Sequence, residues 1–156
     1  MECSVLKLNK LADYATVVLS AMAGAPARVS NGPLLAAETH LPAPTVAKIL
    51  KRLARVGLLE STRGLHGGYR LARDPADISI ADIVRAVEGP IALTDCATHG
   101  SGCTLSRDCR SHASFRLIDS AIQRALEAVT LDQMAQPSAH EVPVRLSDAI
   151  RSQPRS

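Results

Sequence analysis

Aromatic side chains are scarce in this chain of 156 residues, which has two tyrosines, one phenylalanine and no tryptophan. Proteins that bind single-stranded nucleic acid stack the bases on aromatic rings, and so do the common RNA-recognition modules. Tyr14, Tyr69 and Phe115 do not make such a platform. If the chain binds a nucleic acid, we therefore expect duplex DNA.

A long apolar run is also missing, since no stretch of about 18 apolar residues offers a transmembrane helix. The first residues, MECSVLKLNKLADY, contain Glu2, Lys7 and Asn9 where a signal peptide needs an uninterrupted apolar region. The composition, with 46% hydrophobic and 21% charged residues, is that of a globular protein. We therefore expect a cytoplasmic protein without a membrane partner, built as one domain with an extended element.

Acidic residues are scarce in one segment. The net charge of the whole chain is only +3, but seven basic residues stand against two acidic ones between Pro42 and Asp74. The rest of the chain is slightly acidic. A compact basic segment of this kind is the electrostatic pattern expected for contacts with phosphates.

The spacing of apolar residues predicts helices over about residues 9–23, 33–40 and 44–56. The third has an apolar stripe (Val46, Ile49, Leu50, Leu53) and, on another face, a basic stripe (Lys48, Lys51, Arg52, Arg55). A short helix, a tight turn and a helix with one buried and one cationic face are typical of a helix-turn-helix, whose second helix enters the major groove. The alternative is a solvated basic face on an ordinary helix hairpin.

The next residues predict the wing of a winged helix. Strands are expected over residues 58–62 and 69–71, joined by the turn RGLHGG. Arg63 could enter a narrow minor groove, and Gly64, Gly67 and Gly68 allow close approach of the backbone to DNA. A phosphate-binding loop is the alternative interpretation of this turn, but the turn lacks a Walker lysine and is not followed directly by a helix. The predicted DNA-binding residues are Thr45, Lys48, Lys51, Arg52, Arg55, Arg63, Gly64, Gly67, Gly68 and Tyr69.

Cysteine is rare, yet three of the four cysteines lie close together. Cys96, Cys103 and Cys109 occur with His112 within seventeen residues, and only Cys3 lies elsewhere. In a cytoplasmic protein such a group indicates metal ligands or redox thiols more often than disulfides. Spacing alone leaves open an iron-sulfur cluster, a structural zinc ion or a metal-free thiol-disulfide switch. No catalytic grouping is present, so we expect no enzyme.

A family resemblance rests on four stretches: LNKLADYATVVLSAMA, PTVAKILKRLARVGLLESTRGLHGGYRLARD, ISIADIVRAVEGP and the loop with the three cysteines. Together they resemble the iron-sulfur-sensing winged-helix family of transcriptional regulators, of the Isc and Suf cluster-assembly type, and most of all the Suf operon regulators. The resemblance implies a homodimeric repressor of iron-sulfur cluster assembly genes. It also implies binding to a pseudo-palindromic operator and one cluster per subunit. A nitric oxide sensor of the same family is an alternative.

The resemblance assigns ligands residue by residue. Cys96, Cys103 and Cys109 match the thiolate ligands, although six residues separate the first two where the Isc type has five. His112 matches the histidine that completes a [2Fe-2S] site. Alternative fourth ligands are His99 and, for a [4Fe-4S] cluster as in the nitric-oxide-sensing relatives, Asp13 of the partner subunit.

The resemblance also sorts the DNA-binding residues. Where the Isc type has a glutamate that helps to distinguish operator classes, this chain has Ala47. Thr45, Lys48 and Arg52 remain candidates for base or phosphate contacts, and Arg63 matches the wing arginine. We expect Lys51 and Arg55 to touch phosphate only.

The later residues complete the expected architecture. Ser79 and Asp82 have the spacing of a capping box before a helix that ends at Gly89. A helix over about residues 112–129 has a broad apolar face, which we expect to pack on the same helix of a second copy. We thus predict a mainly α fold with a small β wing, a winged helix-turn-helix plus a long C-terminal dimerisation helix. The expected parts are the DNA-binding domain (6–90), the cluster-binding loop (91–112), the dimerisation helix (113–134) and a disordered tail (135–156).

Overall fold

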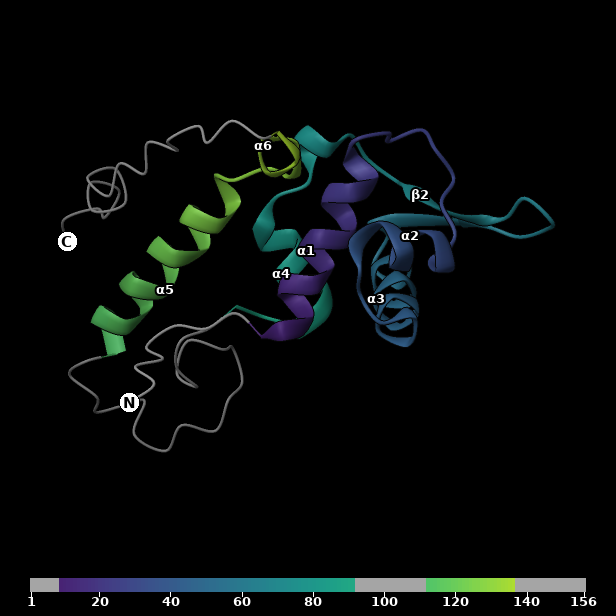
Figure 1. Ribbon diagram of the computed structural model, residues 1–156. Helices are drawn as coiled ribbons and strands as arrows, with labels where there is room; N and C mark the ends of the chain where they lie inside the picture. Colours follow the sequence, from purple (N-terminus) through teal and green to yellow (C-terminus); the bar gives the residue numbers. More distant parts are fainter. Residues whose placement is uncertain (1–8, 92–111, 137–156) are drawn as a thin grey trace.

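The computed structural model describes residues 9–91 and 112–136, and Figure 1 shows their arrangement. The cysteines, His99 and most of the expected tail lie outside the described residues. In chain order the elements are α1 (Lys10–Ala23), α2 (Gly32–Thr39), α3 (Ala43–Arg55), β1 (Leu59–Thr62), β2 (Gly68–Leu71), the 3₁₀ helix η1 (Pro75–Asp77), α4 (Ile80–Glu88), α5 (His112–Glu127) and α6 (Leu131–Ala135). This order confirms the predicted fold class, a mainly α structure with a small β wing.

Polar side chains determine where several helices begin. The side chains of Asn9 and Asn31 accept hydrogen bonds from the first turns of α1 and α2. At the start of α4, Ser79 and Asp82 bond reciprocally to each other's backbone N–H, at 3.1 and 3.2 Å. These bonds satisfy N–H groups that have no partner inside a helix. The capping box predicted from the sequence is thereby confirmed.

Helices α2 and α3 form the predicted helix-turn-helix. His40, in a left-handed conformation (φ 56°), ends α2, and α3 starts just after Pro42. The two helices pack on each other and on α1. The apolar stripe of α3 is fully buried and comprises Val46, Ile49, Leu50 and Leu53. Burial of this stripe sets the rotation of α3 about its own axis, so that the opposite face is exposed to solvent.

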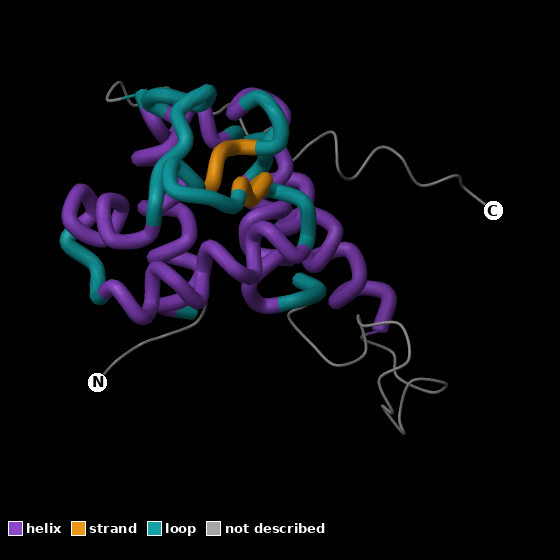
Figure 2. The backbone as a smooth tube through the Cα atoms, turned by 90° about the vertical axis from the view of Figure 1, so that its right-hand side faces the viewer, coloured by secondary structure: helices purple, strands orange, loops and turns teal. Residues whose placement is uncertain are grey.

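Strands β1 and β2 form the predicted wing. They pair antiparallel, with Leu59 opposite Leu71 and Thr62 opposite Gly68. Ser30, in the connection between α1 and α2, exchanges two backbone hydrogen bonds of 2.8 Å with Tyr69 of β2. This bridge attaches the hairpin to the helical body, and Figure 2 shows the short strands in orange among the surrounding helices.

The predicted dimerisation segment, residues 113–134, contains two helices rather than one. Helix α5 ends at Glu127, and Thr130 then caps α6 through reciprocal hydrogen bonds with Gln133. Helix α6 packs on α1 and η1, and its Leu131 is fully buried in the core. In Figure 1, α5 extends along the side of the body opposite to the wing. The chain after α5 thus returns to the winged-helix core, because Leu131 is buried there.

No helix within residues 9–91 and 112–136 has the length and hydropathy that crossing a bilayer requires.

A substitution of the buried Leu131 tests whether α6 packs on the winged-helix core. We expect Leu131→Ala to lower the free energy of unfolding by about 2–5 kcal/mol, the usual cost of truncating a fully buried leucine. Met134→Ala is the control, because Met134 lies on the same short helix but is 46% exposed, and its loss should change stability by less than about 0.5 kcal/mol. Urea denaturation followed by circular dichroism measures both. Equal losses for the two variants would show that α6 does not belong to the core.

Candidate nucleic-acid interface

The solvent-facing side of α3 carries three cations. Lys48, Lys51 and Arg55 are exposed, and their side chains have no hydrogen-bond or ion-pair partner among the described residues. By contrast, four arginines elsewhere in the fold are paired with carboxylates: Arg28, Arg70, Arg73 and Arg85. Positions three and four apart lie on one helix face. The exposed face of α3 therefore presents positive charge that no acidic neighbour in the described residues compensates.

Thr45 and Arg52, the other predicted contact residues of α3, lie at the edges of this face. Thr45 is half-buried in the first turn of the helix. Arg52 is half-buried as well, and its Nη1 donates a hydrogen bond of 2.5 Å to the backbone oxygen of Val87 in α4. The guanidinium group of Arg52 thus donates to a group of the protein, unlike the charged groups of the three exposed cations.

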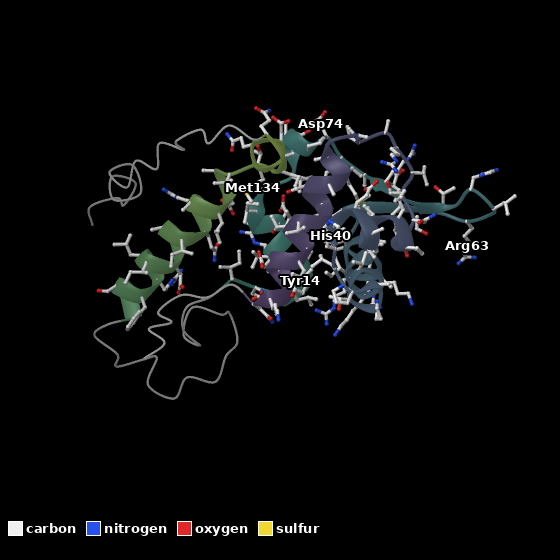
Figure 3. The ribbon with its side chains drawn as sticks, viewed as in Figure 1. Tyr14, His40, Arg63, Asp74 and Met134 are labelled. Carbon is white, nitrogen blue, oxygen red and sulfur yellow. The ribbon has the colours of Figure 1, made fainter. Side chains whose placement is uncertain are left out.

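The wing presents a narrow tip. A backbone hydrogen bond of 3.0 Å from Gly67 to Gly64 closes a four-residue turn. Gly64 has φ +119°, and a Cβ atom at Gly67 would lie 2.4 Å from the carbonyl oxygen of Thr62, so side chains at both positions are disfavoured. Arg63 is exposed just before this turn, on the hairpin that extends from the body (Figure 3). The glycines predicted from the sequence therefore give the wing its shape.

The turn also presents a residue that the sequence analysis did not single out. Leu65 is the first of the two central residues of the turn, and it is 96% exposed. A leucine at the tip of a hairpin does not contribute to the core. A single apolar residue within the glycine-rich turn RGLHGG is the sequence signal from which an exposed leucine at the wing tip could have been predicted.

Tyr69, also predicted as a DNA-binding residue, occupies a different place. Its backbone forms the bridge to Ser30, and its half-buried side chain packs against the hydrophobic core. The structure thus places Tyr69 at the base of the wing rather than at its tip.

The predicted metal ligands are only partly covered by the structure. Cys96, His99, Cys103 and Cys109 lie outside the described residues, and His112 is the first residue of α5. Asp13 is exposed in the first turn of α1. Within residues 9–91 and 112–136, no three histidine, cysteine or acidic side chains are arranged so that they could hold a metal ion.

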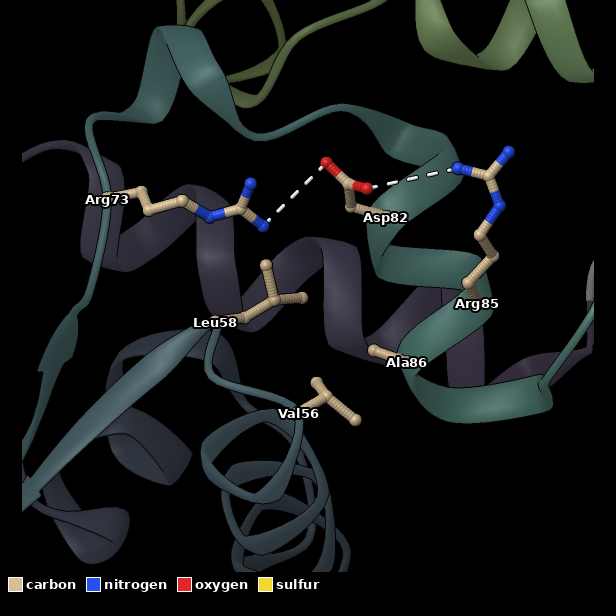
Figure 4. A pocket seen from close by; sticks show the side chains of 6 residues that line it. All are labelled: Val56, Leu58, Arg73, Asp82, Arg85 and Ala86. Carbon is tan, nitrogen blue, oxygen red and sulfur yellow. Dashed lines mark ion pairs between the residues drawn. The ribbon is translucent and has the colours of Figure 1, made fainter.

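A shallow cavity of about 220 Å³ lies where the end of α3, the start of β1 and α4 meet (Figure 4). Arg73 and Arg85 flank the carboxylate of Asp82, at 3.8 and 3.9 Å, and Arg85 also pairs with Glu127 of α5 at 2.6 Å. The two cations thus face two anions. The cavity offers no excess charge to a ligand, and its ion pairs connect α4 with α5.

Comparison with known proteins agrees with this geometry. The profile of the Rrf2 family, described as an iron-dependent transcriptional regulator, matches residues 8–137. The regulator NsrR of Geobacillus kaustophilus is 37% identical over 95 residues, which cover 60% of this chain and 65% of that relative, slightly less than two thirds of its length.

Solved structures share the fold, among them two regulators. CymR, the global cysteine regulator of B. subtilis, superposes with a TM-score of 0.66 at 24% identity, covering 86% of this chain and 99% of that chain. IscR of T. potens superposes with a TM-score of 0.63 at 24% identity, covering 86% and 94%. The family is described as a transcriptional regulator, and so is NsrR, which confirms the prediction that the chain is not an enzyme. The chain belongs to the Rrf2 family and is a DNA-binding transcriptional regulator with a winged helix-turn-helix fold.

Proposed function

We propose that the protein is a homodimeric repressor of iron-sulfur cluster assembly genes, which senses cluster status through an iron-sulfur cluster of its own. The observation that supports this most is the group of Cys96, Cys103 and Cys109, which lie in the sequence between the winged helix and α5, with His112 at the start of α5. The iron-dependent character of the matching family profile supports it as well. A regulator of transcription acts where the chromosome is, so the proposed location is the cytoplasm.

The DNA-reading surface in this proposal consists of α3 and the wing. Lys48, Lys51 and Arg55 are free to neutralise phosphates around the major groove, and Arg63 would reach the adjacent minor groove. Leu65 would bury its exposed apolar surface against the walls of that groove, as apolar side chains of minor-groove proteins do. Two copies would place two such surfaces on half-sites about one helical turn apart, as a pseudo-palindromic operator requires.

The exposed cations of α3 give the first test of this surface. Lys51→Gln should weaken binding to operator and to random duplex alike, and should lower the slope of log affinity against log salt by about one unit, the loss of one phosphate contact. Fluorescence anisotropy over a salt series measures the slope.

Arg116→Gln is the matched control for Lys51→Gln. Arg116 is an exposed cation of α5, a helix on the side of the body opposite to the wing, so its loss should leave the slope unchanged. An unchanged slope for Lys51→Gln would contradict a phosphate contact from this face of α3.

The ligand chemistry fits an iron-sulfur cluster. Thiolates are the common ligands of iron-sulfur clusters, and imidazole replaces thiolate in some [2Fe-2S] sites. Cys96, Cys103 and Cys109 would supply the thiolates, and His112, His99 or Asp13 of the partner subunit the fourth ligand. When bound, the cluster would supply a centre sensitive to redox state and to cluster supply. The residues of the loop would be ordered by their bonds to it, so binding would contribute folding energy to the segment that joins α4 to α5.

Removing one ligand tests the sensor directly. After anaerobic reconstitution, the wild-type protein should carry iron and sulfide and absorb visible light, and Cys103→Ala should lose most of both. Its operator affinity should then differ from that of the wild-type protein. Cys3→Ala is the control, because Cys3 lies outside the cysteine group and its loss should retain iron, sulfide and affinity.

Each alternative to the cluster predicts a distinct result in the same experiment. A colourless wild-type protein that contains zinc would support a structural zinc site. A metal-free protein whose thiols disappear on oxidation and return with reductant would support a thiol-disulfide switch. Equal operator affinities for the reconstituted wild-type protein and Cys103→Ala would contradict the sensor.

Helix α5 is the proposed dimer contact. Leu117 and Ile118 are 37% and 44% exposed, although both are large apolar residues on this helix. Packing against the same helix of a second copy would remove both side chains from water. Burial of apolar side chains is what usually stabilises a symmetric dimer interface.

A charge on the apolar face should therefore separate the subunits. We expect Ile118→Arg to shift the protein from dimer to monomer in sedimentation equilibrium. Val29→Arg adds the same charge to an apolar residue of similar exposure (39%) in the connection between α1 and α2, away from α5, and should leave the dimer intact. If Ile118→Arg stays dimeric, α5 is not the contact.

A further inference from the structure

The last turn of α4 and the residues after it accept hydrogen bonds from three different elements. The Val87 oxygen accepts from the Arg52 guanidinium of α3, and the Glu88 carboxylate accepts from the backbone N–H of Asn9, which caps α1, at 3.0 Å. The Ile91 oxygen accepts from the Gln123 amide of α5 at 3.0 Å. The DNA-reading helix, the first helix and the proposed dimer helix thus all bind residues 87–91, which lead into the segment with the three cysteines.

The bond from Arg52 has a physical reason. Val87 is one of the last four residues of α4, whose carbonyl groups have no partner inside the helix. The C-terminal end of a helix also carries partial negative charge, which favours a cation there. The side chain of Arg52 is half-buried, and its Nη1 donates to this carbonyl. Arg52, whose backbone belongs to α3, therefore satisfies one of the free carbonyl groups at the C-terminal end of α4.

We infer that Arg52 is a positioning residue that couples the recognition helix α3 to the cysteine-containing segment through the end of α4. The inference rests on the proposed sensor function, because it names the contact through which a change after residue 91 would reach DNA. A shift or rotation of the last turn of α4 moves the Val87 carbonyl, and Arg52 transfers that movement to α3. Lys48 lies one turn before Arg52 on the same helix, so a tilt of α3 displaces the cations that face DNA.

A direct role in DNA binding would have a different consequence. A cation that only neutralises a phosphate contributes equally to the cluster-bound and cluster-free protein, and its removal flattens the salt dependence. A coupling residue, in contrast, changes the ratio of the two affinities, since this ratio measures the free energy that connects the two sites.

The experiment measures operator affinity for the full-length protein with and without its cluster, reconstituted anaerobically from ferrous iron and sulfide. The probe is a short duplex selected from random-sequence DNA with the wild-type protein. In wild type we expect the two affinities to differ about 5- to 150-fold, the usual range of coupling between two sites. Arg52→Gln should bring this ratio close to one. Arg52→Lys, which keeps a cationic donor within reach of the carbonyl, should restore most of the ratio.

Three further measurements separate coupling from other effects. Lys51→Gln should weaken both affinities equally and keep the wild-type ratio. Iron and sulfide content shows that Arg52→Gln still binds the cluster, and circular dichroism shows that it folds. If it does not fold, Arg52→Met, which keeps a long aliphatic side chain without the donor, replaces it.

Two outcomes would overturn the role of Arg52. One is a wild-type ratio in Arg52→Gln. The other is an equal loss of both affinities with a flatter salt dependence, which would make Arg52 a phosphate contact. A ratio of one in the wild-type protein would instead contradict the proposed sensor itself, and the two failures are therefore distinguishable.

Discussion

Burial of the apolar stripe of α3 is the constraint on which the rest of the structure depends. Val46, Ile49, Leu50 and Leu53 are all inaccessible to solvent, and together they leave α3 one rotation about its axis. That rotation exposes Lys48, Lys51 and Arg55. It also turns Arg52 toward α4, where the guanidinium finds the Val87 carbonyl. Burial of the hydrophobic face thus determines both the DNA-facing charges and the contact that leads away from them.

The wing depends on a second constraint, the shape of its backbone. The bridge between Ser30 and Tyr69 attaches the base of the hairpin to the body, and the glycines at its tip permit a turn too tight for other side chains. Arg63 and Leu65 are consequently presented at the end of the hairpin, one charged and one apolar. A surface that combines phosphate-binding cations with an apolar tip suits a DNA groove, whose walls are charged above and apolar at the sugars.

The order of the elements along the chain explains how a metal site could act on DNA at all. Helix α4 packs on α1, α3 and α5, and residues 87–91 bind all three of these helices at the point where the chain enters the cysteine-containing segment. The ion pair between Arg85 and Glu127 adds a further link between α4 and α5. Within the described residues, α4 is therefore the element through which the proposed cluster, the proposed dimer helix and the DNA-reading helix are connected.

The sequence by itself determined helices α1 to α5, the wing and the candidate ligands, because these depend on residues that are close along the chain. The stripes of α3 follow from its periodicity, the start of α4 from the pair Ser79 and Asp82, and the metal hypothesis from the spacing of three cysteines. Only the tertiary structure decided that Arg52 binds α4, that Tyr69 lies at the base of the wing, and that Leu131 returns to the core. Arg52 and Val87 are 35 positions apart, and no local pattern encodes which carbonyl a basic side chain will meet. Contacts between distant residues arise from packing of the whole chain, and so they appear only when the fold is known.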